Sequence, residues 1–218
     1  MIVFNHDNNC KEQLEDISQF IYKWYDFKGD EHGNINIDEN IPMPLMWFHK
    51  CYKNVLHKLF AFNKLVQSNR LSVKNGFVTF LIECQGVYIW KTEIEPENSK
   101  VFMCETKQPI KCQLEEERLC GCLYQMLVFE AIMSSKYHCL STWLSKQQLD
   151  NIMKKWNTAP FYQSHWPAYQ TQFYFADNSL AISFPNENGF TFQCGSNVHN
   201  ALKFMNEFVD KNWEDIYI

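Results

Sequence analysis

Residues 76–94 read GFVTFLIECQGVYIWKTEI, and the fold of the chain is best understood by starting from them. Two apolar runs, 77–82 and 87–94, flank a short polar step that ends at Gly86. Runs rich in aromatic and β-branched residues are typical of strands, and glycine permits the positive φ that a tight connection requires. The stretch therefore predicts a β-hairpin, with Trp90 in the middle of its second strand.

The polar step also carries side chains, Glu83 and Gln85, that can bond the backbone groups of the turn. The pattern Glu-x-Gln-Gly-Val with a tryptophan three residues further on resembles the central signature of the SUKH superfamily. This superfamily comprises immunity proteins of bacterial toxin systems and their relatives. The matching positions are Glu83, Gln85, Gly86, Val87 and Trp90, whereas Cys84 stands where the family usually has asparagine.

Two further segments resemble the same family. Residues 41–48, IPMPLMWF, resemble its proline, leucine and aromatic positions at the start of a helix, here Pro42, Leu45 and Phe48. Residues 208–214, FVDKNWE, resemble the end of its C-terminal helix. The resemblance implies a cytoplasmic, non-catalytic protein that binds a cognate toxin domain, often a nuclease or a deaminase, and occludes its active site. It also implies that the signature residues hold the scaffold rather than touch the toxin.

Periodicity and capping patterns predict the elements along the chain. Helices are expected at 11–27, from Pro42 or Pro44 to about Tyr52, and at 115–134, 145–156 and 197–213. Strands are expected at 77–83, 87–94, 100–105, 172–175, 180–184 and 190–194. Residues 28–40 are expected to form a loop or a short extended segment, 95–99 a polar loop, and 55–71 short strands or turns.

This order of elements predicts an α+β fold. The expected organisation is a single SUKH-like domain over 38–218, with a mixed or antiparallel sheet packed against several helices. Residues 1–37 form an N-terminal amphipathic helix and loop that belong to this domain or flank it.

Composition narrows the classes of function. The chain has 218 residues, a net charge of −5 and 16% aromatic residues. An acidic chain does not favour nucleic-acid binding, because phosphate contacts need a basic face. Mild acidity suits a basic protein partner, as a nucleic-acid-cutting toxin would be.

The nine cysteines show no Cys-x-x-Cys pair, and no secretory signal or membrane-spanning run is visible. We therefore expect free thiols in a reducing cytoplasm, without membrane association. No metal or cofactor motif stands out, since His49 with Cys51 or His57 lacks a second pair at ligand spacing. Glu115, Glu116 and Glu117 are expected to lie in solvent at a helix start, where the dipole favours negative charge.

Alternative functions remain open at this point. One is a cysteine-dependent enzyme that uses Cys84, which would need a thiol of lowered pKa. Another is a regulatory scaffold, as eukaryotic relatives of the family suggest. For the immunity hypothesis, the candidate toxin-facing residues are Asp30, Glu31, Asp38, Glu39, Trp166 and Tyr169, the last two lying in a loop whose aromatic residues either pack under the sheet or join an interface.

Overall fold

The structure of the chain, a computed structural model, describes residues 4–5, 7–30, 35, 37–95, 99–161, 164–211 and 213–218. The chain divides into two compact units, an N-terminal unit over Asn5–Glu130 and a C-terminal unit over Ala131–Ile218 with Phe4. Both units combine helices with antiparallel sheets, so the α+β class expected from the sequence is confirmed. The boundary expected between residues 37 and 38 falls inside the N-terminal unit.

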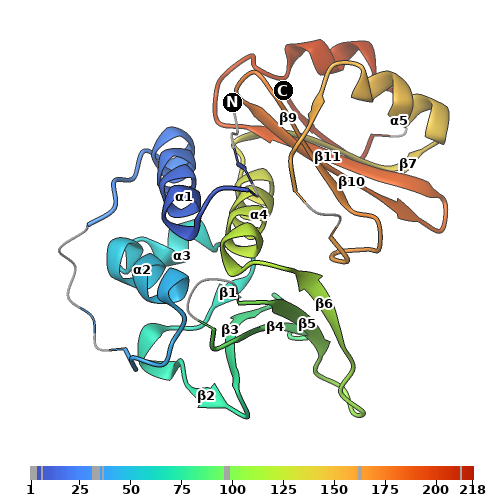
Figure 1. Cartoon of the computed structure of the whole chain (residues 1–218). Helices are drawn as coiled ribbons and strands as arrows, with labels where there is room; N and C mark the ends of the chain where they lie inside the picture. Colours follow the sequence, from blue (N-terminus) through green and yellow to red (C-terminus); the bar gives the residue numbers. More distant parts are fainter. Residues whose placement is uncertain are drawn as a thin grey trace. The chain divides into compact units, whose positions relative to one another are not determined.

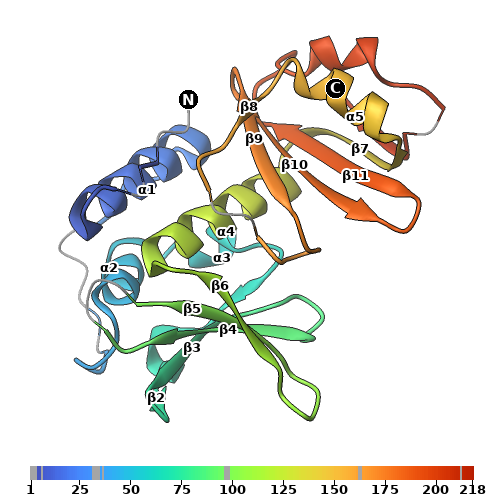
Figure 2. The ribbon, with the colours of Figure 1, turned by 45° about the vertical axis from the view of Figure 1, so that its right-hand side comes forward.

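The N-terminal unit is a sheet with helices on one side (Figures 1 and 2). Its helices are α1 (Cys10–Tyr25), α2 (Met43–Tyr52), α3 (Leu56–Leu59), the 3-10 helix η1 (Ser68–Arg70) and the start of α4 (Leu119–Met133). Its strands are β1 (Lys64–Leu65), β2 (Val73–Lys74), β3 (Phe77–Ile82), β4 (Tyr88–Glu93), β5 (Val101–Glu105) and β6 (Cys112–Glu116). They pair in the order β1-β3-β4-β5-β6, with β2 also on β3, and every ladder is antiparallel.

Local sequence explains why these elements form. Asn9 and Glu12 make a reciprocal capping box that starts α1, and Pro44 occupies the first turn of α2, where its missing N–H costs nothing. In β3 the alternation of buried and half-exposed residues places Val78 and Phe80 in the core. The hairpin predicted from residues 76–94 is present as β3 and β4, which pair antiparallel across the turn.

The helix α4 differs from the others because it has no polar face. Every residue from Leu119 to Ile132 is buried, and that includes the polar Gln125 and Glu130. A helix that is apolar on all sides is a core helix rather than a surface one. The charge of Glu130 is therefore placed in the interior, where it needs partners.

The C-terminal unit contains a second antiparallel sheet. Its strands are β7 (Tyr137–Leu144), β8 (Asn157–Thr158), β9 (Gln172–Ala176), β10 (Ser179–Asn186), β11 (Gly189–Ser196) and β12 (Asp215–Tyr217), in the order β12-β7-β11-β10-β9-β8. Helix α5 (Lys146–Met153) lies against one face of this sheet, and the 3-10 helix η2 (Lys203–Glu207) follows β11 (Figure 2). Leu149 and Ile152 of α5 share a core with Phe192 of β11 and with Met205 and Trp213.

Two predicted helices are wrong in detail, and one long strand was missed. The helix expected from residue 115 begins at Leu119, because Glu115 and Glu116 end strand β6 and are buried rather than solvated. The final helix expected over 197–213 is only the short η2, although its apolar residues do reach the core. Strand β7, which pairs with both β11 and β12, was not predicted.

The expectation that all cysteines are free thiols is also wrong. Cys104 and Cys112 form a disulfide, because the antiparallel pairing of β5 with β6 sets them directly opposite each other. The other seven cysteines are free, and all but Cys84 are buried.

No helix among the described residues is both long enough and apolar enough to cross a bilayer.

Candidate protein-binding site

The turn between β3 and β4 is organised by the carboxylate of Glu83. Its Oε2 accepts hydrogen bonds from the backbone N–H of Gln85 at 2.9 Å and of Val87 at 3.1 Å. Gly86 takes a φ of +71°, and Thr106 donates its hydroxyl to the Gly86 carbonyl at 2.8 Å. Burial opposes the charge of Glu83, but the hydrogen bonds from the Cys84 thiol and the backbone outweigh it and lower the pKa.

A second carboxylate anchors this turn from within the core. Both oxygens of Glu130 accept backbone hydrogen bonds, from Phe62 and from Asn63, at 2.7 Å each. The Asn63 side chain in turn accepts the Cys84 N–H at 3.2 Å. Burial raises the pKa of Glu130 to about 7. Sequence reasoning missed both Asn63 and Glu130, although an acid inside an entirely apolar helix was a visible signal.

The thiol of Cys84 is not prepared for nucleophilic attack. It is exposed and lies 3.0 Å from Oε1 of Glu83. Burial, together with the hydrogen bond and the negative charge of Glu83, raises the pKa of Cys84. A reactive cysteine needs a lowered pKa, so this surrounding is the opposite of what a cysteine-dependent enzyme requires.

The other signature positions are mostly inside the fold. Trp90, Leu45 and Phe48 have no exposed surface, and Pro42 is buried as well. Gln85 is exposed and Gly86 half-exposed at the tip of the turn. These residues position α2 and the hairpin, and most of them cannot touch a partner.

The outward face of α2 is different. Met43, Met46, Trp47 and Lys50 recur at the i, i+3, i+4, i+7 spacing of one helix face, and none of the four is buried. Together with Ile35 and Ile37 they line a groove of about 310 Å³. We call this feature the α2 groove; its wall is apolar except for Lys50.

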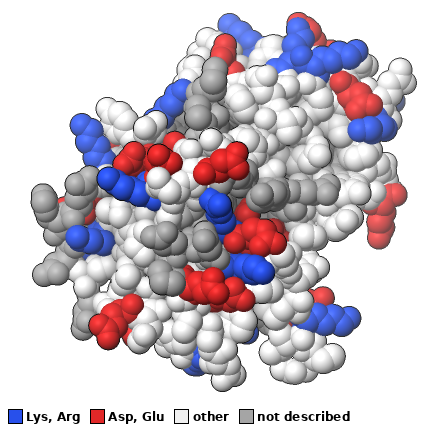
Figure 3. All heavy atoms as spheres, viewed as in Figure 1, with Lys and Arg blue, Asp and Glu red and all other residues white. Residues whose placement is uncertain are grey.

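Acidic residues lie next to the groove-lining residue Ile37 in the sequence. Asp38 and Glu39 follow Ile37 directly and are exposed. Hydrogen bonds from the backbone and side chain of Asn40 lower the pKa of Asp38. Asp30 is exposed too, and its N–H bonds the Cys51 carbonyl, whereas Glu31 lies outside the described residues. On the face seen in Figure 3, acidic and basic side chains are interspersed.

The two aromatic candidates in the loop before β9, Trp166 and Tyr169, differ in their exposure to solvent. Trp166 is buried, and Ser164 accepts its N–H and donates to its carbonyl. Tyr169 is 63% exposed and lies beside His165. Trp166 is therefore wrong as a toxin-facing candidate, and Tyr169 stays a prediction.

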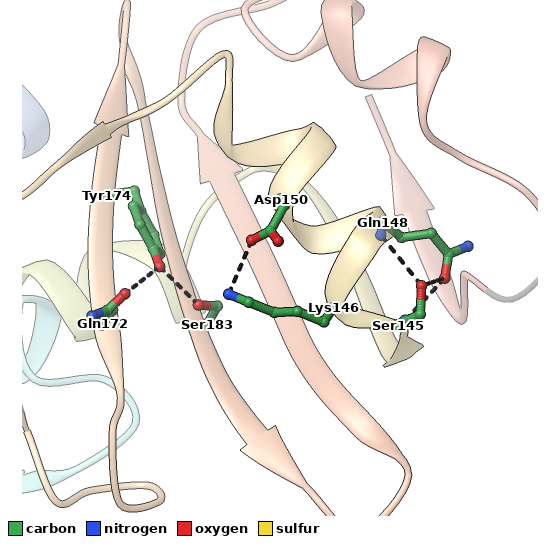
Figure 4. A network of polar contacts seen from close by, with 7 residues as sticks. All are labelled: Ser145, Lys146, Gln148, Asp150, Gln172, Tyr174 and Ser183. Carbon is green, nitrogen blue, oxygen red and sulfur yellow. Dashed lines mark hydrogen bonds and ion pairs between the residues drawn. The ribbon is translucent and has the colours of Figure 1, made fainter.

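A group of polar contacts in the C-terminal unit includes tyrosine, serine and lysine, which are residue types that also occur in active sites (Figure 4). Tyr174 donates to Gln172 at 2.7 Å and lies 3.1 Å from the Ser183 hydroxyl, while Lys146 pairs with Asp150 at 2.9 Å. Burial raises the pKa of Tyr174, so its phenol stays protonated, and Ser183 is buried. The network satisfies buried hydroxyl groups beneath α5, whose start is fixed by the capping box that Ser145 makes with Gln148.

The described part of the chain gathers no cluster of three or more His, Cys, Asp or Glu residues that could hold a metal ion. Comparison with family models, curated proteins and solved structures finds no match for this chain.

Proposed function

We propose that this chain is a protein-binding module, and specifically an immunity protein that neutralises a cognate toxin domain by covering its active site. The observation that carries the proposal is the α2 groove, in which Met46 and Trp47 are presented to solvent on a rigid helix. Protein interfaces favour methionine and aromatic residues at their centre, and a preformed groove limits the entropy lost on binding. The resemblance of residues 83–90 to the SUKH signature supports the choice of an immunity protein.

The acidic border of the α2 groove suggests the character of the partner. Asp38 and Glu39 would face basic side chains, as on a nuclease or deaminase that holds nucleic acid. The partner's apolar side chain would enter the groove between Met43 and Trp47. A cytoplasmic location belongs to this proposal, because an immunity protein protects the cell that makes the toxin.

The test uses the toxin domain that the proposal expects to be encoded in a neighbouring reading frame, and the absence of such a domain would count against an immunity protein. The full chain is mixed with the purified toxin, and both affinity and inhibition of toxin activity are measured. Met46→Asp places a charge in the α2 groove and is expected to weaken binding at least thirtyfold, as loss of a central contact does. The control is Ile110→Asp, which makes the same kind of change at an exposed apolar residue outside the groove and should bind as the wild type does.

A double variant, Asp38→Lys with Glu39→Lys, should slow association more than it speeds dissociation. Equal binding by wild type and Met46→Asp would overturn the assignment of the groove. Binding of a partner that has no toxic activity, through the same groove, would overturn immunity in favour of a regulatory scaffold.

A further inference from the structure

A second pocket lies on the half-exposed face of the sheet in the N-terminal unit. Its volume is about 280 Å³, and its lining combines three cations with apolar and hydroxyl side chains: Val66, Arg70, Ser72, Lys74, Phe77, Thr79, Ile82 and Lys91. We call it the cation pocket. None of its residues belongs to the α2 groove, so a ligand bound in the cation pocket is independent of the proposed function.

Strand pairing explains how these residues converge. Lys74 of β2 lies opposite Phe77 of β3, and Thr79 of β3 lies opposite Lys91 of β4. Val78 and Phe80 alternate with them and point into the core, which leaves Phe77 and Thr79 on the outer face. Arg70, at the end of η1, brings the third cation to the same pocket.

Within the described part of the chain, the three cations have no anionic partner. No acid lines the cation pocket, and none of the ion pairs among the described residues involves Arg70, Lys74 or Lys91. Glu93 lies opposite Phe77 in the ladder, but it is not part of the lining. Three like charges gathered on an otherwise acidic chain repel one another, and a bound anion removes that repulsion.

The donor set suits a phosphate group. The arginine fork binds phosphate through two parallel hydrogen bonds, and lysine ammonium groups add point charges. Ser72 and Thr79 supply hydroxyl donors in the same lining. A phosphate held here would exchange water for charge-assisted hydrogen bonds from at least two strands.

The apolar part of the lining favours a ligand that carries an organic group as well as a phosphate. Phe77, Val66 and Ile82 present carbon surface within the pocket, and the Phe77 ring is held edge-on by Phe102 at 5.7 Å between centroids. A planar group can stack on such a ring, while a volume of about 280 Å³ limits the ligand to a small molecule. An extended nucleic acid would need a basic track rather than one pocket, and it would meet a chain of net charge −5.

We propose that the cation pocket binds a small organic phosphate ester of the mononucleotide class. The phosphate is held by Arg70, Lys74 and Lys91, and the planar group lies over Phe77. The proposal concerns binding alone, and it assigns the lining residues no role in a reaction.

The test is isothermal titration calorimetry on the full chain with AMP, CMP, inorganic phosphate and adenosine. We expect both nucleotides to bind, phosphate to bind more weakly and adenosine to bind least. Lys74→Gln and Lys91→Gln should each weaken nucleotide binding about tenfold or more, because each removes a charged hydrogen-bond donor. The matched control is Lys107→Gln, an exposed lysine outside the pocket, which should leave affinity unchanged.

Phe77→Leu separates the two parts of the ligand, since it should weaken AMP binding but leave phosphate binding intact. Melting temperatures of all variants verify that the fold is retained. The proposal is overturned if the wild type binds no nucleotide, or if the lysine variants bind as the wild type does. It is equally overturned if only a single-stranded oligonucleotide or a poly-glutamate peptide binds.

Discussion

At the scale of single residues, the pKa of a buried carboxylate in this chain depends on whether burial or its hydrogen bonds have the larger effect. Glu83 is supplied with backbone and thiol hydrogen bonds, which lower its pKa. Glu116 is more completely buried, and desolvation outweighs the hydrogen bonds it accepts from the N–H groups of Glu117 and Arg118, so its pKa is raised to about 7. The charge of Glu83 is therefore part of the turn structure, whereas Glu116 is neutral in a large fraction of molecules near pH 7.

Replacing Glu83 by glutamine tests the role of that charge. Glu83→Gln keeps the shape, and its amide oxygen can still accept the N–H groups of Gln85 and Val87, but the negative charge is lost and an NH₂ group faces the Cys84 thiol in place of Oε1. We expect the free energy of unfolding to fall by about 1–3 kcal/mol, because hydrogen bonds to a charged acceptor are stronger than hydrogen bonds to a neutral one. Urea unfolding measures it, and the exposed Gln85→Ala serves as the control, with an expected change below about 0.5 kcal/mol. A loss of equal size in both variants would contradict a specific role for the carboxylate.

Trp90 is the largest fully buried side chain of the hairpin. Trp90→Ala should lower the free energy of unfolding by about 3–5 kcal/mol, because it removes the ring and leaves a cavity. Trp143, which is 54% exposed, provides the comparison, and Trp143→Ala should cost far less. Thermal unfolding distinguishes the two, and an unchanged melting temperature for Trp90→Ala would refute the core position.

His49 introduces a pH dependence of definite sign. Burial lowers its pKa from 6.5 to about 4, so the unfolded chain takes up a proton before the folded chain does. The free energy of unfolding is therefore highest, as far as His49 is concerned, above about pH 6.5. It falls as the pH drops towards 4, by about 3 kcal/mol at most. We therefore expect wild type to lose more stability than His49→Leu between pH 7.5 and pH 5. Urea unfolding at both pH values gives the difference, and parallel losses in the two proteins would rule the effect out.

At the scale of elements, local signals identified those elements whose pattern is set by one buried face. The apolar spacing of α1 and α5, the capping box of α5 and the two apolar runs of the β3–β4 hairpin were readable from the sequence. The start of α4 was not readable from the sequence. The acidic residues Glu115 and Glu116 belong to strand β6, which forms only because it pairs with β5. Likewise, the apolar stripe after residue 200 reflects burial in the core of the C-terminal unit, which short 3-10 turns satisfy as well as a helix does.

The contact between β11 and the end of α4 can be tested at Gly195. A Cβ there would overlap the Ser135 side chain and lie 3.0 Å from the Ile132 carbonyl. Gly195→Ala should therefore destabilise the protein by about 1–3 kcal/mol, as overpacking does. Ser135→Gly removes the main clash, so Gly195→Ala should cost less stability in the Ser135→Gly protein than in the wild type. Denaturant unfolding of the four proteins measures the coupling, and additive losses would contradict the proposed contact.

At the scale of the whole molecule, the chain has two surfaces with different chemistry in its N-terminal unit. The α2 groove is apolar with acids beside it in the chain, and the cation pocket is basic with an aromatic wall. The acidic residues of the first were candidates from the sequence, but its methionine and tryptophan wall was not. The cation pocket was not predicted from the sequence. Its cations and its aromatic wall come from separate segments of the chain, namely η1, β2, β3 and β4.

Sequence alone was sufficient for the α+β class, the hairpin at residues 76–94 and the capped helices, because each depends on neighbours within a few positions along the chain. The folded structure was needed to see that Glu83 and Cys84 are linked through Asn63 to Glu130, that Cys104 meets Cys112, and that three cations share one pocket. Strand pairing and helix packing join residues far apart in the chain, and no local pattern encodes which distant segments will meet.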